Sequence, residues 1–473
     1  MTKKAFKYAM QRGLGSCVVA LKNEQNIEAK QKFLPIVLWG CSHDMAYDAQ
    51  CEGCRSFYLY ELISEFADPT PFLDKASERL FRCIGSSGWE FEQACELLAH
   101  FAADGEVRAR EILADCYDVL LGKLAKKRRR TGYGMLPERD QFEWLCIELM
   151  ELCQGDRERL IRQYELLVKD MGTLIQKNSL YSFADFDWFQ DDSKQKLGRR
   201  TVERILRSRE AEEPVRVYAL SMEECLNVRK ENRAERRKQE PQCADEIYQR
   251  LQAGKQCSQL LTHRPMRGKK QEQEVLKLAA YYKEEKNPEL RYKLLQLLAN
   301  RYCAWTLDIE QLIRDARAED TVLAERAMDA LSYRRDSRVK EYARELWQKG
   351  IHKAWAVSMF AANYEEEDRA FLTEAVKQIP ILYDSGEWHQ AFSDVMRVFD
   401  APGRNKPKEI LPYLYQNTLC SFCREAVVRE MGRRRMLTRE LLEELRYDCN
   451  EEIRIYANKR VKCFSKEIYT SDG

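Results

Sequence analysis

The sequence predicts an all-α protein, and three observations lead to that prediction. Glycine and proline contribute only 20 and 12 of the 473 residues, whereas 33% of the residues are charged. Few turn-forming residues and many charges favour long solvated helices over turn-rich β folds. Apolar residues also recur with the helical period along most of the chain, and no segment sustains the two-residue alternation of a β-strand. An apolar content of 44% is enough for a folded core.

In the N-terminal half, apolar faces at helical spacing predict helices over 39–47, 51–62, 142–153 and 160–171. The last of these carries Leu160, Ile161, Tyr164, Leu167, Val168 and Met171 on one broad face. A basic stretch from Lys126 to Pro137, which contains two glycines, interrupts this half of the chain. We therefore expect helices on both sides of a loop near residue 130.

Two polar segments predict the domain limits. The stretch 229–240 is continuously polar, and Thr262 to Glu272 combines proline and glycine with several bases. We predict an N-terminal helical region with degenerate repeats over 1–228, a polar linker over 229–272 and a repeat-containing region over 273–473. In this last region proline follows Asn287 just inside a helix start, and apolar faces follow at 339–346 and 453–464.

An internal repeat is the most informative feature. A polar capping residue is followed three residues later by an apolar residue and then by a base, in segments that begin at Asp104, Asn287, Asp336 and Asn450. Segments at Glu212 and Cys420 fit loosely, and the segment at Asp320 keeps the cap but has Ala324 in place of the base. The basic positions are Arg108, Arg216, Arg291, Lys340, Arg424 and Arg454. Because the base can reach caps or carbonyls of an adjacent repeat, we predict structural roles near helix starts for these six residues.

These residues resemble the second helix of a HEAT-type repeat, whose consensus carries Asp, then Val-Arg, then Ala at this spacing. The resemblance is clearest over 287–347 and 420–464, weaker at Asp104 and Glu212, and absent from the first hundred residues. It implies an elongated α-solenoid of HEAT-like antiparallel helix pairs, and an ordinary helical bundle with good caps is the alternative. The spacing is irregular, because 33 residues separate Asn287 from Asp320 but 16 separate Asp320 from Asp336. Either some units are degenerate, or the motif marks only half of each helix pair.

The formal net charge is only +2, so nucleic-acid or membrane binding would need a local patch. One such patch is the run Lys126, Lys127, Arg128, Arg129 and Arg130, which enters a glycine-containing loop with Tyr133. Bases beside an aromatic residue can bind phosphates while the ring stacks on a nucleobase. Bases near a helix C-terminus also complement the helix dipole, and charge runs are usually just solvated. Both interpretations stay open.

The 17 cysteines are scattered, which is typical of reduced, buried thiols in a cytoplasmic protein. Cys41, His43, Cys51 and Cys54 contain the ligand types of a tetrahedral zinc site. We nevertheless predict no metal there, because both flanks are predicted helices that can pack without one. In a cysteine-rich chain the same spacing arises by coincidence, as in Cys420-Ser-Phe-Cys423.

Neither a phosphate-binding loop nor a His-Glu-x-x-His motif occurs in the sequence. The longest stretch without Asp, Glu, Lys or Arg runs from Ile410 to Cys423, which is too short and too polar to span a membrane. We therefore expect a non-enzymatic, cytoplasmic helical-repeat scaffold that needs no cofactor and binds a macromolecular partner, foremost a protein, on its concave face. The alternative is a nucleic-acid-binding HEAT-like protein that uses the basic cluster 126–130. Such a protein would be related in architecture to DNA alkylation-repair glycosylases, which use Trp, Asp and Arg in a concave groove.

Overall fold

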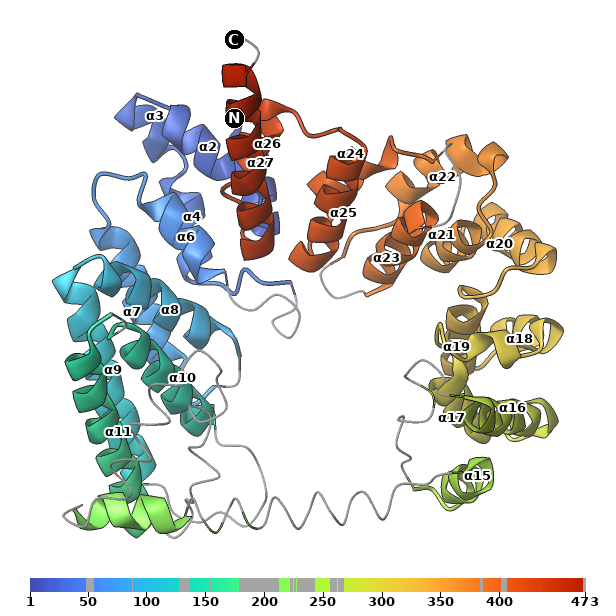
Figure 1. Ribbon diagram of the computed structural model, residues 1–473, viewed down its shortest axis with the longest axis horizontal. Helices are drawn as coiled ribbons and strands as arrows, with labels where there is room; N and C mark the ends of the chain where they lie inside the picture. The colour runs from blue at the N-terminus through green and yellow to red at the C-terminus, as the bar shows by residue number, and fades with distance from the viewer. Residues whose placement is uncertain are drawn as a thin grey trace. The chain divides into compact units, whose positions relative to one another are not determined.

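The computed structural model describes residues 1–47, 55–86, 88–126, 137–153, 155–177, 212–221, 224, 227, 243–255, 262, 268–382, 386–400 and 406–470, with side chains described up to residue 462. Every regular element in these ranges is a helix, so the prediction of an all-α protein is confirmed (Figure 1). Among these helices, none is both long enough and apolar enough to cross a membrane.

Contacts divide the chain into two compact units, Met1–Glu235 with Thr438–Gly473, and Arg236–Leu437. The predicted linker 229–272 contains the described helix α15 (Ala244–Gln252), while most of its other residues lie outside the described ranges. The predicted domain limits at 228 and 272 therefore stay a prediction. In the contact-based division the last helices of the chain belong to the first unit.

The first unit is built from helices that pack with their neighbours in sequence. They are α1 (Lys3–Arg12), α2 (Ser16–Asn23), α3 (Ile27–Gln31), α4 (Leu34–Cys41), α6 (Ser56–Ile63), α7 (Thr70–Arg82), α8 (Glu90–Ala103), α9 (Val107–Lys126), α10 (Pro137–Glu151), α11 (Arg157–Lys177), α26 (Arg439–Leu445) and α27 (Glu451–Thr470). The central helix α8 contacts α6, α7, α9 and α10, and most of its apolar residues are buried. The core of this unit therefore surrounds α8.

The return of the C-terminal segment depends on two glycines near the N-terminus. Gly13 ends α1 in the left-handed region at φ 69°, and its carbonyl accepts the backbone N–H of Cys449 at 2.9 Å. Gly15 lies against the backbone of Glu444, where a Cβ would overlap the carbonyl oxygen. Helix α2 can therefore pack directly on α26.

One predicted helix in this unit is wrong in extent. In place of the helix expected over 39–47, α4 runs from Leu34 to Cys41. Ser42 closes it by donating its hydroxyl to the carbonyl of Trp39 at 3.1 Å. The local hydroxyl bond competes with continuation of the helix. The second predicted helix, 51–62, starts outside the described residues and corresponds in its described part to α6.

The second unit consists of successive helix pairs. Its helices are α15, α16 (Lys269–Glu284), α17 (Pro288–Leu298), α18 (Ile309–Ala316), α19 (Thr321–Leu331), α20 (Ser337–Lys349), α21 (Lys353–Ala362), α22 (Arg369–Ala375), α23 (Glu387–Asp400), α24 (Ile410–Asn417) and α25 (Ser421–Arg433), with the short 3₁₀ turns η4 (Ala304–Thr306), η5 (Glu366–Asp368) and η6 (Val376–Gln378). Helices α17, α19, α21, α23 and α25 contact one another in sequence as one row, and α16, α18, α20 and α24 each pack on the row member that follows them (Figure 1).

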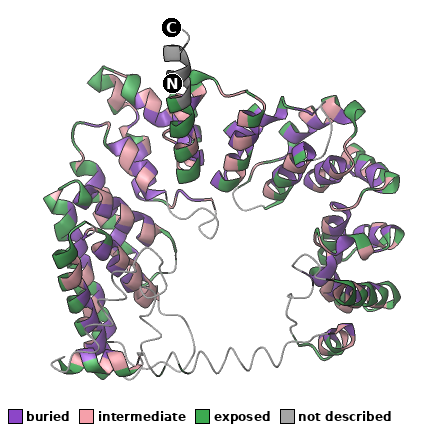
Figure 2. Cartoon of the chain, in the orientation of Figure 1, coloured by how far each residue is buried: buried purple, intermediate pink, exposed green. Residues whose placement is uncertain are grey.

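Burial follows this arrangement. Helix α21 lies between α19 and α23 in the row and also contacts α20. Ala354 and every residue from Ala356 to Ala361 are buried, and Figure 2 shows that the helices of this unit carry buried faces. Small residues along α21 allow this close approach, since four of its ten residues are alanine. The core of the second unit therefore runs along the row.

Side-chain caps mark the helix starts of the repeat motif. Asn287, Asp320 and Asp336 each accept a backbone N–H from the first turn of α17, α19 and α20. The first two helices belong to the row, whereas α20 is the first member of the next pair. The motif therefore marks helices of both kinds, which explains the gaps of 33 and 16 residues. The resemblance to the second helix of a pair does not hold at Asp336.

Candidate functional site

The predicted phosphate-binding cluster lies almost wholly outside the described residues. Lys126 is the exposed last residue of α9, and Lys127, Arg128, Arg129, Arg130 and Tyr133 lie beyond it in 127–136. Their role in nucleic-acid binding stays a prediction.

The candidate metal ligands near the N-terminus are only half described, because Cys51 and Cys54 lie outside the described ranges. Cys41 is buried at the end of α4, and burial raises the pKa of its thiol to about 12. Such a thiol stays protonated at neutral pH in the metal-free protein. The exposed His43 stacks on Trp39 with a ring separation of 4.5 Å, and its Nδ1 lies 2.8 Å from the Trp39 carbonyl oxygen.

Two of the six repeat bases link separate helices in the second unit. Arg291 on α17 forms an ion pair with Asp315 on α18, whose carboxylate also accepts the Tyr282 hydroxyl from α16 and Gln311 Nε2 at 3.2 Å. Lys340 on α20 pairs with Asp368 at 2.6 Å and also contacts Glu365. Each base therefore joins its helix to an element further along the chain, Arg291 to α18 and Lys340 to η5.

The other four repeat bases have different surroundings. Arg424 is fully buried and donates to the Thr418 carbonyl at 3.4 Å. Arg454 donates to the carbonyls of Asp448 and Cys449 at 2.9 and 2.8 Å, and its guanidinium lies 4.4 Å from the centre of the Phe57 ring. Arg108 forms an exposed ion pair with Asp74, and Arg216 is exposed.

A cavity of about 550 Å³ lies in the second unit, where the ends of several helices meet. We call it the cationic pocket and define it by the residues Tyr333, Arg335, Lys340, Tyr364, Arg397 and Lys406. Asn363 fixes one wall, because its Oδ1 accepts the Asp336 N–H at 2.8 Å and its Nδ2 donates to the Arg334 carbonyl at 2.9 Å. These bonds hold the start of α20 against the end of α21.

The carboxylates around the pocket are already engaged by bases. Arg338 bonds to Asp336 at 2.9 Å and lowers its pKa to about 2, so this carboxylate stays ionised and paired. Asp368 and Glu365 hold Lys340, and Asp394 forms an ion pair with Arg397 at 2.7 Å. The pocket's own acids therefore leave part of its positive charge uncompensated.

Arg335 carries that excess charge, and Lys406 lines the same pocket. Arg335 is exposed and, within the described part of the chain, pairs with no carboxylate. Lys406 is only 7% exposed and lies 5.8 Å from the ring centre of Tyr364. Burial lowers the pKa of Lys406, and the positive charges of Arg434 and Arg335 lower it further. Positive charge therefore accumulates beside two tyrosines, which suits a carboxylate or phosphate group.

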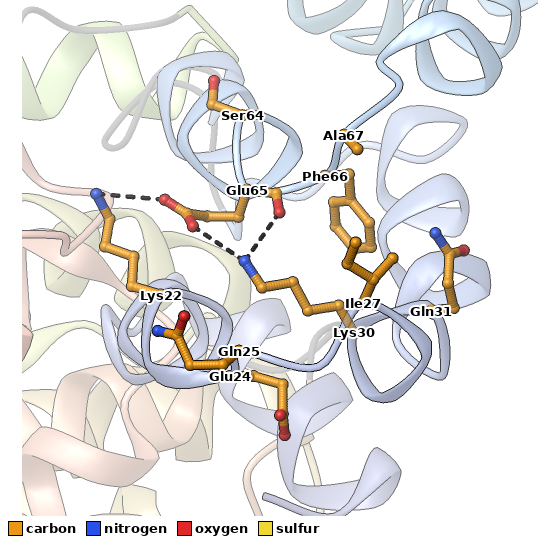
Figure 3. A pocket seen from close by; sticks show the side chains of 10 residues that line it. All are labelled: Lys22, Glu24, Gln25, Ile27, Lys30, Gln31, Ser64, Glu65, Phe66 and Ala67. Carbon is orange, nitrogen blue, oxygen red and sulfur yellow. Dashed lines mark hydrogen bonds and ion pairs between the residues drawn. The ribbon is translucent and has the colours of Figure 1, made fainter.

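A second cavity, in the first unit, differs in its charge balance. It has a volume of about 400 Å³ and lies between α2, α3 and the end of α6 (Figure 3). Figure 3 shows Lys22 and Lys30 both directed at Glu65, with Nζ–Oε distances of 3.4 and 3.5 Å. Lys30 also donates to the Glu65 carbonyl at 3.1 Å. Because one carboxylate engages both lysines, this cavity is a weaker candidate for an acidic ligand.

The structure also brings Trp, Asp and Arg together on the row of the second unit, which no spacing in the sequence indicated. Trp355 on α21 donates its indole N–H to Asp329 on α19 at 2.9 Å, and Arg326 bonds to the same carboxylate at 3.0 Å. Burial raises the pKa of Asp329. The three side chains link α19 to α21, so their contacts are explained by a structural role.

No protein-family model matches the chain, and no curated protein matches it. Two solved structures align over most of their length. One is the crystal structure of an engineered protein, 12% identical, with 94% of this chain and 97% of that chain covered and a TM-score of 0.17. The other comes from work on a phosphorylation switch that controls the interaction between cadherin and beta-catenin; it is 13% identical, with 98% and 99% covered and a TM-score of 0.24. TM-scores this low support no argument about the arrangement or function of this chain.

Proposed function

We propose that this protein is a non-enzymatic helical-repeat scaffold that binds an acidic segment of a protein partner at the cationic pocket. The observation that carries the proposal is the charge of Arg335 at a pocket that Tyr333 and Tyr364 also line, while the lining carboxylates Asp336 and Glu365 are engaged by Arg338 and Lys340. A HEAT-like solenoid of helix pairs would present such a pocket along a continuous surface.

The alternation of helices in the second unit supports the scaffold part of the proposal. Among the described helices, the row members make their main contacts with near neighbours along the chain, which is typical of repeat architectures in which each unit buries its face against the next. The ion pair of Arg291 with Asp315 joins α17 to α18, and that of Lys340 with Asp368 joins α20 to η5, so both connect elements close together along the chain. Such an architecture holds surface residues in fixed relative positions, which a binding scaffold requires.

The charge distribution favours a protein partner over nucleic acid. The formal net charge of +2 gives no general attraction to a polyanion. Among the described residues, the cationic pocket gathers positive charge beside tyrosines that can pack against a side chain next to a carboxylate. An acidic protein segment offers carboxylates for the bases and apolar groups for the tyrosines within a few residues of each other.

A direct test compares two fluorescent probes of equal net charge, a Glu- and Asp-rich peptide that contains tyrosine and a single-stranded oligonucleotide. We expect the peptide to bind the full chain more tightly. Arg335→Glu should weaken peptide binding by about fivefold or more, because it replaces an attraction worth about 1 kcal/mol with a repulsion. Arg317→Glu is the matched control, since Arg317 is an exposed arginine of the same unit that does not line the pocket.

Two results would contradict the proposal: unchanged peptide binding in Arg335→Glu, or tighter binding of the oligonucleotide. Affinity capture with nuclease treatment adds an independent check. Loss of every captured partner on nuclease digestion would favour nucleic acid.

The alternative function, nucleic-acid binding with base-directed chemistry, draws on one observation, the meeting of Trp355, Asp329 and Arg326. If these residues act on a nucleic acid, Asp329→Asn should abolish base release from an alkylated DNA probe while thermal stability changes little. A purely structural role predicts a lower melting temperature and no base release by either protein.

A further inference from the structure

A histidine and two cysteines meet in the second unit, and none of the three lines the cationic pocket. His389 is the third residue of α23, Cys420 is the N-cap of α25, and Cys423 is the third residue of that helix. Their potential ligand atoms all lie within 4.8 Å of one another, and Cys423 Sγ is 3.7 Å from His389 Nε2. No other group of three or more such residues comes together in the described ranges.

The separations agree with those of a tetrahedral zinc site. Zinc–sulfur bonds of about 2.3 Å and zinc–nitrogen bonds of about 2.0 Å place sulfur and nitrogen about 3.6 Å apart, and two sulfurs about 3.8 Å apart. The distance of 3.7 Å between Cys423 and His389 matches the first value. The ligand atoms of all three residues lie within 4.8 Å of one another. A small side-chain rotation at Cys420 can therefore bring its sulfur to the separation that a zinc ion requires.

The local fold explains why the two cysteines converge. The backbone of Cys420 is extended, with φ −76° and ψ 119°, and α25 begins at the next residue. N-cap and N3 side chains lie side by side at a helix start, as in a capping box. The partial positive charge at the same helix end stabilises thiolates. Contact between α23 and α25 then brings in the imidazole.

We propose that His389, Cys420 and Cys423 bind one Zn²⁺ ion, with water in the fourth coordination position. Thiolate and imidazole ligands select zinc over magnesium and calcium, which prefer oxygen. Cys420 is buried, whereas His389 and Cys423 are half-buried, so the ion is anchored on one side and accessible on the other. Binding releases the two thiol protons to solvent as two zinc–sulfur bonds form. This inference does not rest on the proposed binding function.

The test uses the full chain, reduced and freed of metal, and titrates it with zinc alone and with cobalt(II) alone. We expect one tight equivalent of zinc, and with cobalt the absorption bands of a tetrahedral site with thiolate charge transfer. Cys423→Ser should lower the zinc affinity by more than about 100-fold, since loss of an outer partner alone costs about 10- to 100-fold. His389→Gln should do the same while keeping both thiols.

Cys243→Ser is the matched control, because Cys243 is also an N-cap cysteine of the second unit but does not belong to the group. It should bind zinc like the unmodified chain. Circular dichroism identifies variants that fail to fold, and His389→Gln tests the site without removing a thiol if Cys423→Ser is one of them. No tight equivalent in the unmodified chain would overturn the proposal. So would equal losses in Cys243→Ser and Cys423→Ser, or a cobalt spectrum that neither site variant alters.

Discussion

Replacement of Asp315 by alanine should destabilise the second unit more than removal of any one of its partners. The Asp315 side chain is 4% exposed and accepts hydrogen bonds from Tyr282 on α16, Arg291 on α17 and Gln311 on its own helix. Without the carboxylate, the guanidinium of Arg291, whose side chain is 16% exposed, and the buried Tyr282 hydroxyl both lose their acceptor. Helices of two successive pairs would thereby lose a common contact.

The magnitude follows from burial. Breaking a buried ion pair by removing one partner costs about 3–5 kcal/mol, because the other charge is left uncompensated. An orphaned buried hydroxyl adds about 1 kcal/mol or more. We expect Asp315→Ala to lower the free energy of unfolding by about 4 kcal/mol, and Asp315→Asn to cost about half as much, because the amide oxygen still accepts.

Hydrogen–deuterium exchange is the suitable assay, since a chain of two units need not unfold in one step. Amides of α16, α17 and α18 should lose protection in Asp315→Ala, while helices of the first unit keep theirs. A double-mutant cycle with Arg291→Met should give a coupling energy of about 1–3 kcal/mol. A loss below about 1 kcal/mol, or a coupling energy near zero, would refute the inference that this pair links the helices.

Three further outcomes are expected. Arg454→Ala removes two hydrogen bonds to backbone carbonyls and should lower the stability of the first unit by about 1 kcal/mol or more, measured by urea unfolding; unchanged stability with lost binding would instead assign Arg454 to a ligand site. Burial, reinforced by neighbouring carboxylates, raises the pKa of Glu148 to about 9. The unfolded chain therefore binds fewer protons than the folded chain between about pH 4.5 and 9, and the free energy of unfolding falls as the pH rises through that window. Glu148→Gln should therefore be at least about 1 kcal/mol more stable than the unmodified chain at pH 8 and should show no advantage near pH 4, and melting curves with the same pH dependence in both proteins would contradict this. Gly15→Ala should cost about 2 kcal/mol or more because its Cβ overlaps the Glu444 carbonyl oxygen, whereas Gly122→Ala, a helix position with open space, should be neutral or stabilising in the same thermal melt.

The sequence alone determined the helices and many of their starts, because these depend on contacts within a few residues. An N-cap bond joins Asn287 to Glu289, and Asp320 to Val322, so the pattern of cap and apolar residue predicts it directly. The same reasoning failed at 39–47, where a serine hydroxyl bonded to a nearby carbonyl ends the helix at Cys41. Periodicity reports which face is apolar, but it reports the end of a helix poorly.

Which helices meet was decided only by the tertiary structure. The repeat motif gave no means to tell that α17 and α19 share a row while α20 begins the next pair. The six repeat bases look alike in sequence, yet Arg424 is fully buried and Arg108 forms an exposed ion pair. A cap motif specifies the first turn of a helix, whereas the partner of the following base depends on which element packs beside it.

Neither candidate site was predicted from the sequence, because each depends on which elements pack together. The spacing of Cys420 and Cys423 is visible in the sequence, but by itself it indicates only coincidence in a cysteine-rich chain. The third candidate ligand, His389, lies 34 residues before Cys423, so no local pattern connects it to the two cysteines. The cationic pocket draws Arg335 and Lys406 from segments far apart in the chain, while the run of bases at 126–130 lies, apart from Lys126, outside the described residues. Local sequence patterns determine the helices, whereas the packing of their apolar faces brings distant side chains together. Burial of apolar surface decides which helices are neighbours, and it does so independently of the polar residues at the helix ends.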